Sequence, residues 1–251
     1  TGKIHKIGEV HDGASTMDFM EQEAERGITI QSAATTCFWK GHQFNVIDTP
    51  GYPDFRGPTL SALAAVETCA VVINGQNGIE YSTHRMMEYA KARGLCRLLI
   101  VNKIDGANLP LLVDRIRETF GPECLPINLP SQGGKAVVDC FTKPAGVSDF
   151  GTVAAAHQRI IDQVVEVDEN VMGRYLEEGE AGLSGQELHD AFEQCLREGH
   201  LVPICFVSAR TGAGVKELLE LFEKLMPSPA EGNPPMFVKG RGSEGERFET
   251  T

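Results

Sequence analysis

Three nearly continuous apolar runs, separated by segments with helical character, constrain the fold of this chain most strongly. The runs are AVVIN at 70–74, RLLIVN at 97–102 and VPICFVSA at 202–209. Strands that are apolar on both faces are typical of parallel sheets, because helices cover both sides of such sheets. Helices are expected between the runs, at 59–67, 80–93 and 108–120. This alternation predicts an α/β domain with a mostly parallel sheet and helices on both faces.

Other segments predict additional elements around that sheet. Two β-rich runs, 28–39 and 42–48, flank Lys40-Gly41 and predict a hairpin. Two short strands are expected around the Gly-Gly turn within 125–141, and one long helix is expected at 153–177. The S-x-x-E pair Ser184 and Glu187 predicts a capped helix that reaches Arg197. An apolar stripe from Val215 to Met226 predicts the last helix, and residues 1–28 are expected to form a mobile loop with one helical turn.

The first chemical motif is Asp48-Thr49-Pro50-Gly51, which follows the apolar residues Val46 and Ile47. In open α/β sheets, ligands bind beyond the carboxyl ends of the strands. At that position Asp48 could hold Mg²⁺ through a water molecule, and the backbone N–H of Gly51 could contact a terminal phosphate. An ordinary turn would have the same sequence, so the motif alone leaves both interpretations open.

The second motif is Asn102-Lys103-Ile104-Asp105, directly after the run RLLIVN. The Asp105 carboxylate could accept two parallel hydrogen bonds from the ring N–H and the exocyclic amine of guanine. Adenine has no such donor pair, so binding it would leave a charge unpaired. Asn102 could tie neighbouring loops and contact the base, while the stem of Lys103 covers the base's face. The alternative is a charged turn after a strand.

Two shorter motifs complete the set. Ser208-Ala209-Arg210 follows the expected buried strand VPICFV, and the backbone N–H of Ala209 could donate to the guanine carbonyl oxygen. Thr29, within RGITI, could place its hydroxyl on Mg²⁺ and its N–H on the γ-phosphate, and it would lose both contacts when that phosphate leaves. Ile-Thr-Ile is also ordinary strand sequence, so this motif too has a purely structural interpretation.

Composition and charge exclude several classes of protein. The chain has no run of about 18 apolar residues, so no membrane span is expected. Its seven cysteines are scattered and form no CxxC pair, which argues against a disulfide framework or a zinc site and fits a reducing cytoplasm. The net charge of −12 argues against a generic nucleic-acid binder, although local patches could still contact a ribosome.

Together and in this order, the motifs resemble those of translational GTPases, in particular elongation factor G and its paralogues. The resemblance covers nearly the whole chain and is carried by IHKIGEVHDGASTMDFMEQEAERGITI, DTPG, VNKID and VSAR. It implies a P-loop NTPase-like G domain that binds GTP or GDP with Mg²⁺ and hydrolyses GTP. In this family hydrolysis on the ribosome, with its tRNA and mRNA, drives translocation. Ribosome-protection and release-factor relatives share RGITI and remain alternatives.

The spacing of the motifs indicates an insertion. Asn102 and Ser208 lie 106 positions apart, whereas a complete βαβ unit needs only about 30 residues. We therefore expect a first part of the G domain at 1–121, an inserted α+β subdomain at 122–200, and the closing strand and helix at 201–230. Residues 231–251 are expected to be a linker and the start of a truncated second domain. Elongation factor G carries an insertion at this point, and its compact form here favours a second-type paralogue.

Two departures from the family pattern bear on activity. The phosphate-gripping motif G-x-x-x-x-G-K-[ST] does not occur in the 251 residues, so we expect a chain truncated before Thr1 that binds GTP weakly. The family has a histidine after DTPG that positions the attacking water, whereas this chain has Tyr52. Tyrosine has a reference pKa near 10 and is a poor base at neutral pH.

The resulting expectation is a cytoplasmic, monomeric GTPase that works on the ribosome without a membrane. The alternative is a ribosome-binding paralogue, for recycling or regulation, in which GTP hydrolysis is weak. Tyr52 is the residue that favours the alternative. The acidic run Asp18–Glu25 is expected to form a solvated face, although the resemblance places it in the first switch of the family. No histidine has the spacing of a metal site.

Overall fold

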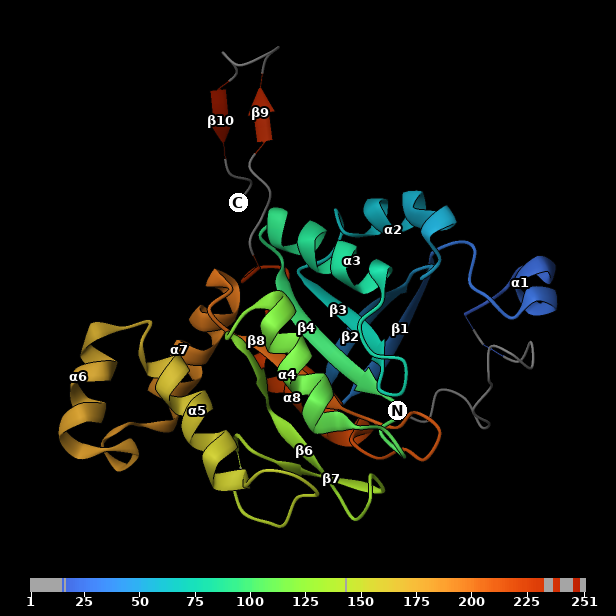
Figure 1. The fold of residues 1–251 in the computed structure, drawn as a ribbon. Helices are drawn as coiled ribbons and strands as arrows, with labels where there is room; N and C mark the ends of the chain where they lie inside the picture. Colours follow the sequence, from blue (N-terminus) through green and yellow to red (C-terminus); the bar gives the residue numbers. More distant parts are fainter. Residues whose placement is uncertain (1–14, 16, 143, 233–236, 240–245, 249–251) are drawn as a thin grey trace.

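The computed structural model describes residues 15, 17–142, 144–232, 237–239 and 246–248 of the chain. Figure 1 shows a central sheet with helices packed around it and a hairpin near the C-terminus. The elements up to the middle of the chain are α1 (Glu21–Arg26), β1 (Ala33–Trp39), β2 (His42–Asp48), η2 (Pro53–Phe55), α2 (Arg56–Ala62), β3 (Thr68–Asn74), α3 (Tyr81–Ala92), β4 (Cys96–Asn102) and α4 (Leu109–Phe120). The remaining elements are β5 (Cys124–Pro126), β6 (Asn128–Ser131), β7 (Ala136–Asp139), α5 (Val153–Val165), α6 (Glu169–Glu178), η3 (Glu180–Gly182), α7 (Gly185–Glu198), β8 (Val202–Phe206), α8 (Val215–Leu225), β9 (Phe237–Lys239) and β10 (Glu246–Phe248).

The central sheet is parallel, and its strand order is β3-β4-β8-β5. The middle strands β4 and β8 are the apolar runs of the sequence, and nearly all their residues are buried. In the register, Asn74 pairs with Asn102, and Val101 pairs with Phe206. The carboxyl ends of these strands therefore lie side by side, which confirms the predicted parallel sheet.

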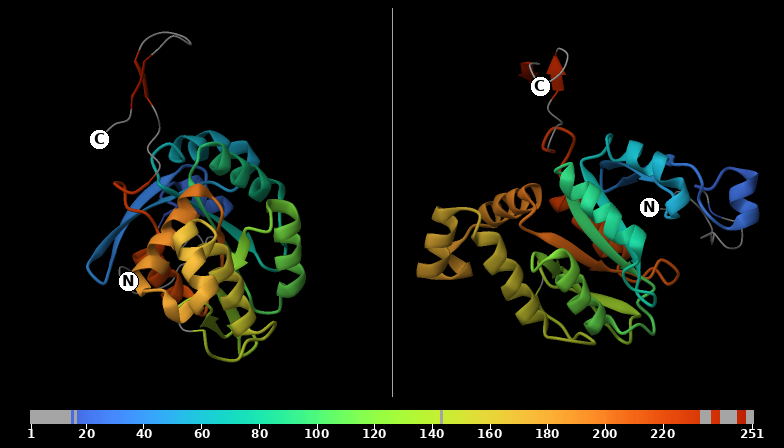
Figure 2. Two further views of the ribbon diagram at one scale, coloured as in Figure 1. Left: turned by 90° about the vertical axis from the view of Figure 1, so that its left-hand side faces the viewer. Right: turned by 45° about the horizontal axis from the view of Figure 1, so that its top comes forward.

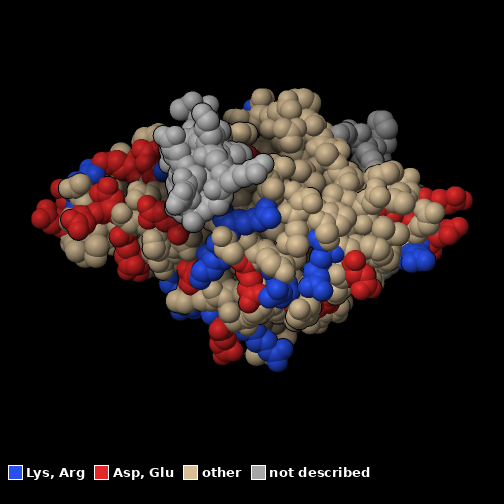
Figure 3. All heavy atoms as spheres, turned by 90° about the horizontal axis from the view of Figure 1, so that it is seen from above, with Lys and Arg blue, Asp and Glu red and all other residues tan. Residues whose placement is uncertain are grey.

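Helices cover both faces of this sheet. In Figure 2, α3 and α4 lie on one side, whereas α7 and α8 lie on the other. The core between these layers includes the fully buried side chains of Ile116 on α4, Leu99 on β4 and Phe192 on α7. The charge is distributed unevenly, since Figure 3 shows acidic side chains gathered at the end of the molecule that carries α6. None of the helices described is long and apolar enough to cross a membrane.

The predicted hairpin forms a small antiparallel sheet of its own. β1 and β2 pair from Ala33↔Asp48 to Trp39↔His42, and the turn uses Lys40 and Gly41 at φ 46° and 86°. The first strand begins at Ala33 rather than residue 28, because the preceding backbone bonds to Glu23 instead of a neighbouring strand. Within the described part of the chain, β2 pairs only with β1, and β3 pairs only with β4.

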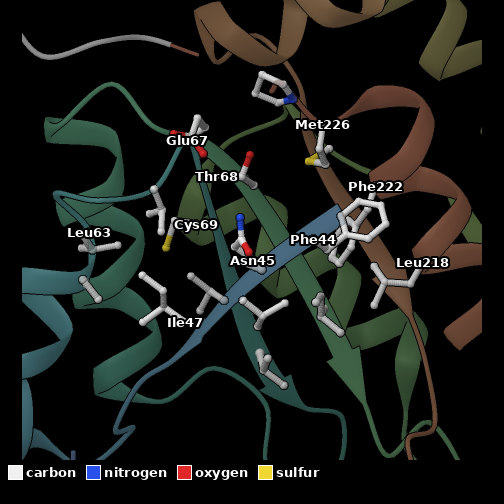
Figure 4. Close-up of a pocket in the computed structure, with 18 of the residues that line it drawn as sticks. Phe44, Asn45, Ile47, Leu63, Glu67, Thr68, Cys69, Leu218, Phe222 and Met226 are labelled. Carbon is white, nitrogen blue, oxygen red and sulfur yellow. The ribbon is translucent and has the colours of Figure 1, made fainter. Parts of the chain in front are cut away.

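A groove of about 1430 Å³ lies along these two strands. Figure 4 shows Asn45 and Ile47 on β2, with Leu63, Thr68 and Cys69 among the other residues that line it. Phe44 at one end of the groove packs against Phe222 of α8, with ring centroids 6.1 Å apart. The neighbouring edges of β2 and β3 therefore face a space lined by apolar and polar side chains.

The segment between α4 and β8 contains the predicted additional elements, with one correction. The helix expected at 153–177 is two helices, α5 and α6, because the Asp168 side chain accepts hydrogen bonds from the N–H groups of Asn170 and Val171 and starts a new helix. The capping box of Ser184 and Glu187 and the Gly133-Gly134 turn between β6 and β7 are confirmed. The helix expected at 59–67 lies earlier, at Arg56–Ala62.

The proposed division at 1–121, 122–200, 201–230 and 231–251 stays a prediction. Its inserted part is tied closely to the main sheet, because β5 pairs with β8 and the Asn128 side chain bonds the backbone of Phe206. At the two ends, residues 1–14, 16, 233–236, 240–245 and 249–251 lie outside the described residues.

Candidate functional site

The predicted site residues follow the carboxyl ends of three strands. Asp48 ends β2, Asn102 ends β4, and Ser208 comes two residues after β8. The Asn102 side-chain oxygen accepts hydrogen bonds from the N–H of Lys103, at 2.8 Å, and from the N–H of Ala209, at 3.0 Å. One amide side chain thus joins two loops whose residues lie 107 positions apart.

Asp105 lies within this joined pair of loops and has a charged partner. Its carboxylate is 2.6 Å from the guanidinium of Arg210, and the two side chains are 38% and 69% exposed. The backbone carbonyl of Asp105 accepts a hydrogen bond from the Gln76 side chain at 3.1 Å. The structure therefore brings the second and third motifs together at one end of the parallel sheet.

The backbone around Ser208 is held by short-range bonds. The N–H of Ser208 donates to the carbonyl of Ala213, and the N–H of Gly212 donates to the carbonyl of Ser208, both at 2.8 Å. The Ser208 side chain is buried, and its oxygen accepts from the N–H of Thr211. Because Ala209 and Arg210 stand inside this closed turn, their backbone positions are fixed while the Arg210 side chain extends into solvent.

Asp48 lies in a negative environment at the end of β2. Burial raises the pKa of its carboxyl group, the negative charges of Asp18 and Glu23 raise it further, and a hydrogen bond from the N–H of Thr49 opposes the shift. Bound Mg²⁺ would relieve this repulsion, and carboxylate and hydroxyl oxygens are ligands that it accepts. Among the described residues, no group of three or more His, Cys, Asp or Glu side chains is placed to hold a metal ion.

Thr29, the second proposed Mg²⁺ ligand, is bonded within the chain. Its hydroxyl donates to a carboxylate oxygen of Asp18 at 2.8 Å. The loop that carries both residues is closed by Glu23, whose carboxylate accepts from the N–H groups of Met20, Ile30 and Gln31 at 2.9–3.0 Å. Burial alone would raise the pKa of Glu23, but these backbone donors outweigh it, and the pKa is lowered.

Glu23 corrects one sequence expectation. The sequence predicts a solvated face for the acidic run Asp18–Glu25, but Glu23 has 0% exposure. The usual sequence signal for such a carboxylate is a serine or threonine three residues earlier, and this chain has Met20 there. The sequence motifs therefore did not indicate that Glu23 is buried or that Asp18 accepts a hydrogen bond from Thr29.

The DTPG segment and Tyr52 lie along the groove between β2 and β3. Asp48, Gly51 and Tyr52 line it, whereas Asn102, Asp105 and Ser208 do not. The segment is anchored where the buried hydroxyl of Thr59 donates to the carbonyl of Pro50 at 3.1 Å. Tyr52 is 54% exposed and stands at the start of η2. The groove thus lies beside the first motif and apart from the other strand-end loops.

Comparisons with known proteins agree with this arrangement. Residues 1–228 match the model of the elongation factor Tu GTP binding domain. Elongation factor G 2 of Vibrio cholerae serotype O1 (strain ATCC 39315 / El Tor Inaba N16961) is 39% identical over 254 residues, which cover 93% of this chain and 36% of that protein. Elongation factor G 2 of Trichodesmium erythraeum (strain IMS101) is 35% identical over 274 residues, which cover 99% and 38%.

A solved structure from Thermus thermophilus, described as the crystal structure of ttk003000868, is similar with a TM-score of 0.82. It is 31% identical, and the match covers 92% of this chain and 37% of the other. The chain thus spans somewhat more than a third of the length of these relatives. It belongs to the family of elongation factor Tu-type GTP-binding domains.

Proposed function

We propose that this chain, as a member of the elongation factor Tu-type GTP-binding family related to elongation factor G 2, is the nucleotide-binding domain of a ribosomal GTPase. The observation that carries the proposal is the link from Asn102 to Ala209, which joins two strand-end loops beside the Asp105 carboxylate. That carboxylate would read the donor pair of guanine, and the N–H of Ala209 would face the guanine carbonyl. The domain would bind GTP and GDP.

A nucleotide competition experiment with the full-length protein tests this. We expect GDP to displace a fluorescent guanine nucleotide while ADP does not, because adenine would leave the Asp105 carboxylate unpaired. The variant Asp105→Asn should lose guanine affinity and gain affinity for xanthine nucleotides, whose carbonyl group replaces the exocyclic amine. Equal binding of GDP and ADP by the wild-type protein would refute the proposed function.

At the other end of the site, Asp48 and Thr29 would hold Mg²⁺ beside the phosphates. The ion supplies positive charge that offsets the charge developing on the phosphates during hydrolysis. Thr29 would have to exchange its hydrogen bond with Asp18 for this role. Loss of the γ-phosphate would release the loop again, and this order–disorder change would be the switch.

We further propose that these 251 residues by themselves bind GTP weakly, because they contain no G-x-x-x-x-G-K-[ST] motif to hold the phosphates. Among the described residues, the edges of β2 and β3 that border the groove have no further strand between them. Titration of the 251-residue chain with a fluorescent GTP analogue tests the consequence. We expect weak binding, and micromolar affinity would contradict this part of the proposal.

Tyr52 supports a second candidate, a ribosome-binding paralogue in which hydrolysis is slow or differently triggered. Its phenol is exposed beside the DTPG segment, and a phenol is a poor base near pH 7. Single-turnover GTP hydrolysis with ribosomes should accelerate in Tyr52→His, since imidazole can position the attacking water. An unchanged rate would count against this role for Tyr52, and hydrolysis by the wild-type protein at saturating ribosomes separates the two candidates.

The cellular role of the whole protein follows as a proposal from the same family. Its partner would be the ribosome, with the tRNA and mRNA bound there, and its main step would be translocation during elongation. The proposed domain is a cytoplasmic monomer whose inserted part, 122–200, is held to the sheet through β5. Ribosome binding and translocation assays with the full-length protein would test these assignments.

A further inference from the structure

The ion pair between Arg210 and Asp105 occupies the position where the proposed function places guanine. One guanidinium nitrogen of Arg210 lies 2.6 Å from one carboxylate oxygen of Asp105. Recognition of guanine needs both oxygens of that carboxylate, because the base presents two parallel N–H donors. The guanidinium already uses one of these oxygens, so the base and the guanidinium compete for this carboxylate.

Of the two partners, Arg210 is the one that can move. The backbone beside Asp105 is tied by the bond from Gln76 to its carbonyl and by the bond from the N–H of Gly75 to the carbonyl of Asn102. Ile104, just before it, is 2% exposed and anchors the loop in the core. The Arg210 side chain is 69% exposed, so it can leave by rotation of its own stem.

We propose that Arg210 is a built-in competitor of the base, which closes the Asp105 carboxylate in the free protein and must leave before guanine binds. This inference rests on the proposed function, since it assigns Asp105 to the base. When only a fraction of the protein molecules has the site open for binding, the apparent affinity is reduced in proportion to that fraction. Arg210 would thus slow the association of nucleotides, and this effect would be limited to nucleotides whose base binds the Asp105 carboxylate.

The expected size of the effect follows from the exposure of the pair. Exposed ion pairs contribute little free energy, which corresponds to a factor of about 1.5 to 5 in the population of the open site. Salt also weakens the attraction between the two charges, because the Debye length of the solution falls to about 3 Å at an ionic strength of about 1 M. Removal of the guanidinium should therefore have its largest effect at low ionic strength and a smaller effect at high ionic strength.

The test uses the full-length protein and stopped-flow binding of a fluorescent GDP analogue. We expect Arg210→Ala to bind about 1.5- to 5-fold faster than the wild type at low salt, with an unchanged dissociation rate. The matched control Arg93→Ala removes an exposed guanidinium after α3, before β4 begins and so at the opposite end of that strand. It should leave both rates unchanged, and the difference between Arg210→Ala and the wild type should become smaller at high salt.

A second comparison separates competition from a general effect of charge. In the Asp105→Asn background no carboxylate remains for Arg210, so Arg210→Ala should not alter capture of a fluorescent xanthosine diphosphate. An equal gain in that background would overturn the proposal. Slower association or faster dissociation in Arg210→Ala would overturn it as well, because Arg210 would then help to hold the base, and so would unchanged rates. Failure of the proposed function would be seen separately, as a lack of guanine preference in the wild-type protein.

Discussion

Replacement of Asn128 by alanine should destabilise the whole domain, because this side chain continues the hydrogen bonding of the main sheet. The N–H of Ile127 donates to the carbonyl of Ile204 in β8. Two residues further along β8, the Asn128 side chain makes the hydrogen bonds that the backbone of a neighbouring strand would otherwise make. Its oxygen accepts from the N–H of Phe206 at 2.7 Å, and its nitrogen donates to the carbonyl of Phe206 at 3.2 Å. Both residues are buried, at 4% and 0% exposure.

The magnitude follows from those two bonds. A buried backbone group left without a partner costs about 1–3 kcal/mol, so loss of both bonds would cost about 2–6 kcal/mol. We expect a loss of about 2–4 kcal/mol in the free energy of unfolding, because single substitutions rarely cost more than about 4 kcal/mol. Domains of this kind have about 5–15 kcal/mol in total, and the variant should still fold. Because Phe206 stands two residues before Ser208, the same change should loosen the loop that holds Ala209.

Equilibrium unfolding in urea measures this effect, with an unchanged dependence on denaturant as the sign that the unfolded state is the same. Asn45→Ala is the matched control, because Asn45 is exposed on β2 and its side chain bonds the side chains of Thr36, which is half-buried, and Gln43, which is exposed. It should change the free energy of unfolding by no more than about 0.5 kcal/mol. A loss below about 1 kcal/mol in Asn128→Ala would show that the Phe206 groups find other partners, which would refute the reasoning.

Three further predictions concern single residues. Because the pKa of Glu23 is lowered in the folded protein, its ionised carboxylate stabilises the loop at pH values above the ordinary glutamate pKa of about 4.3. This stabilisation is lost as the pH falls through the lower folded-state pKa, so amide exchange at Ile30, corrected for intrinsic rates, should rise there. The variant Glu23→Gln should show no such rise. Gly214→Ala should cost more than about 1 kcal/mol in thermal unfolding, because φ is +74° and the new Cβ would lie 2.2 Å from the Phe206 carbonyl oxygen. Asp168→Ala should cost about 1 kcal/mol through loss of the α6 cap, and an unchanged melting temperature would contradict that role.

The sequence predicted the parallel sheet well because its signal is local. Strands buried on both faces must be apolar along their whole length, and β4 and β8 coincide closely with the runs RLLIVN and VPICF. The single helix expected at 153–177 was wrong for a related reason. Its apolar pattern continues through the break at 166–168, which contains no glycine or proline, and one aspartate within an acidic stretch does not by itself mark the start of a helix.

The candidate site was predictable in its positions and not in its pairings. Polar motifs directly after apolar strands must gather at one end of a parallel sheet, which placed Asn102 and Ser208 side by side. The bond from Arg210 to Asp105 joins residues 105 positions apart, and no local pattern indicates it. The burial of Glu23 was missed for the same reason, because an acidic run is usually solvated unless the fold supplies backbone donors.

These pairings change how ligand binding by this site should be understood. Asp105 bonds Arg210, Ala209 donates to Asn102, and Thr29 donates to Asp18, so the groups proposed to contact base and Mg²⁺ already have partners. Binding therefore exchanges one hydrogen bond for another, and the net gain for each contact is far smaller than the strength of the bond itself. Selectivity then comes mainly from the penalty on a mismatched ligand, which breaks an internal hydrogen bond of the protein and forms none in its place. For this reason the partners of the site residues should tune its affinity as strongly as the site residues themselves.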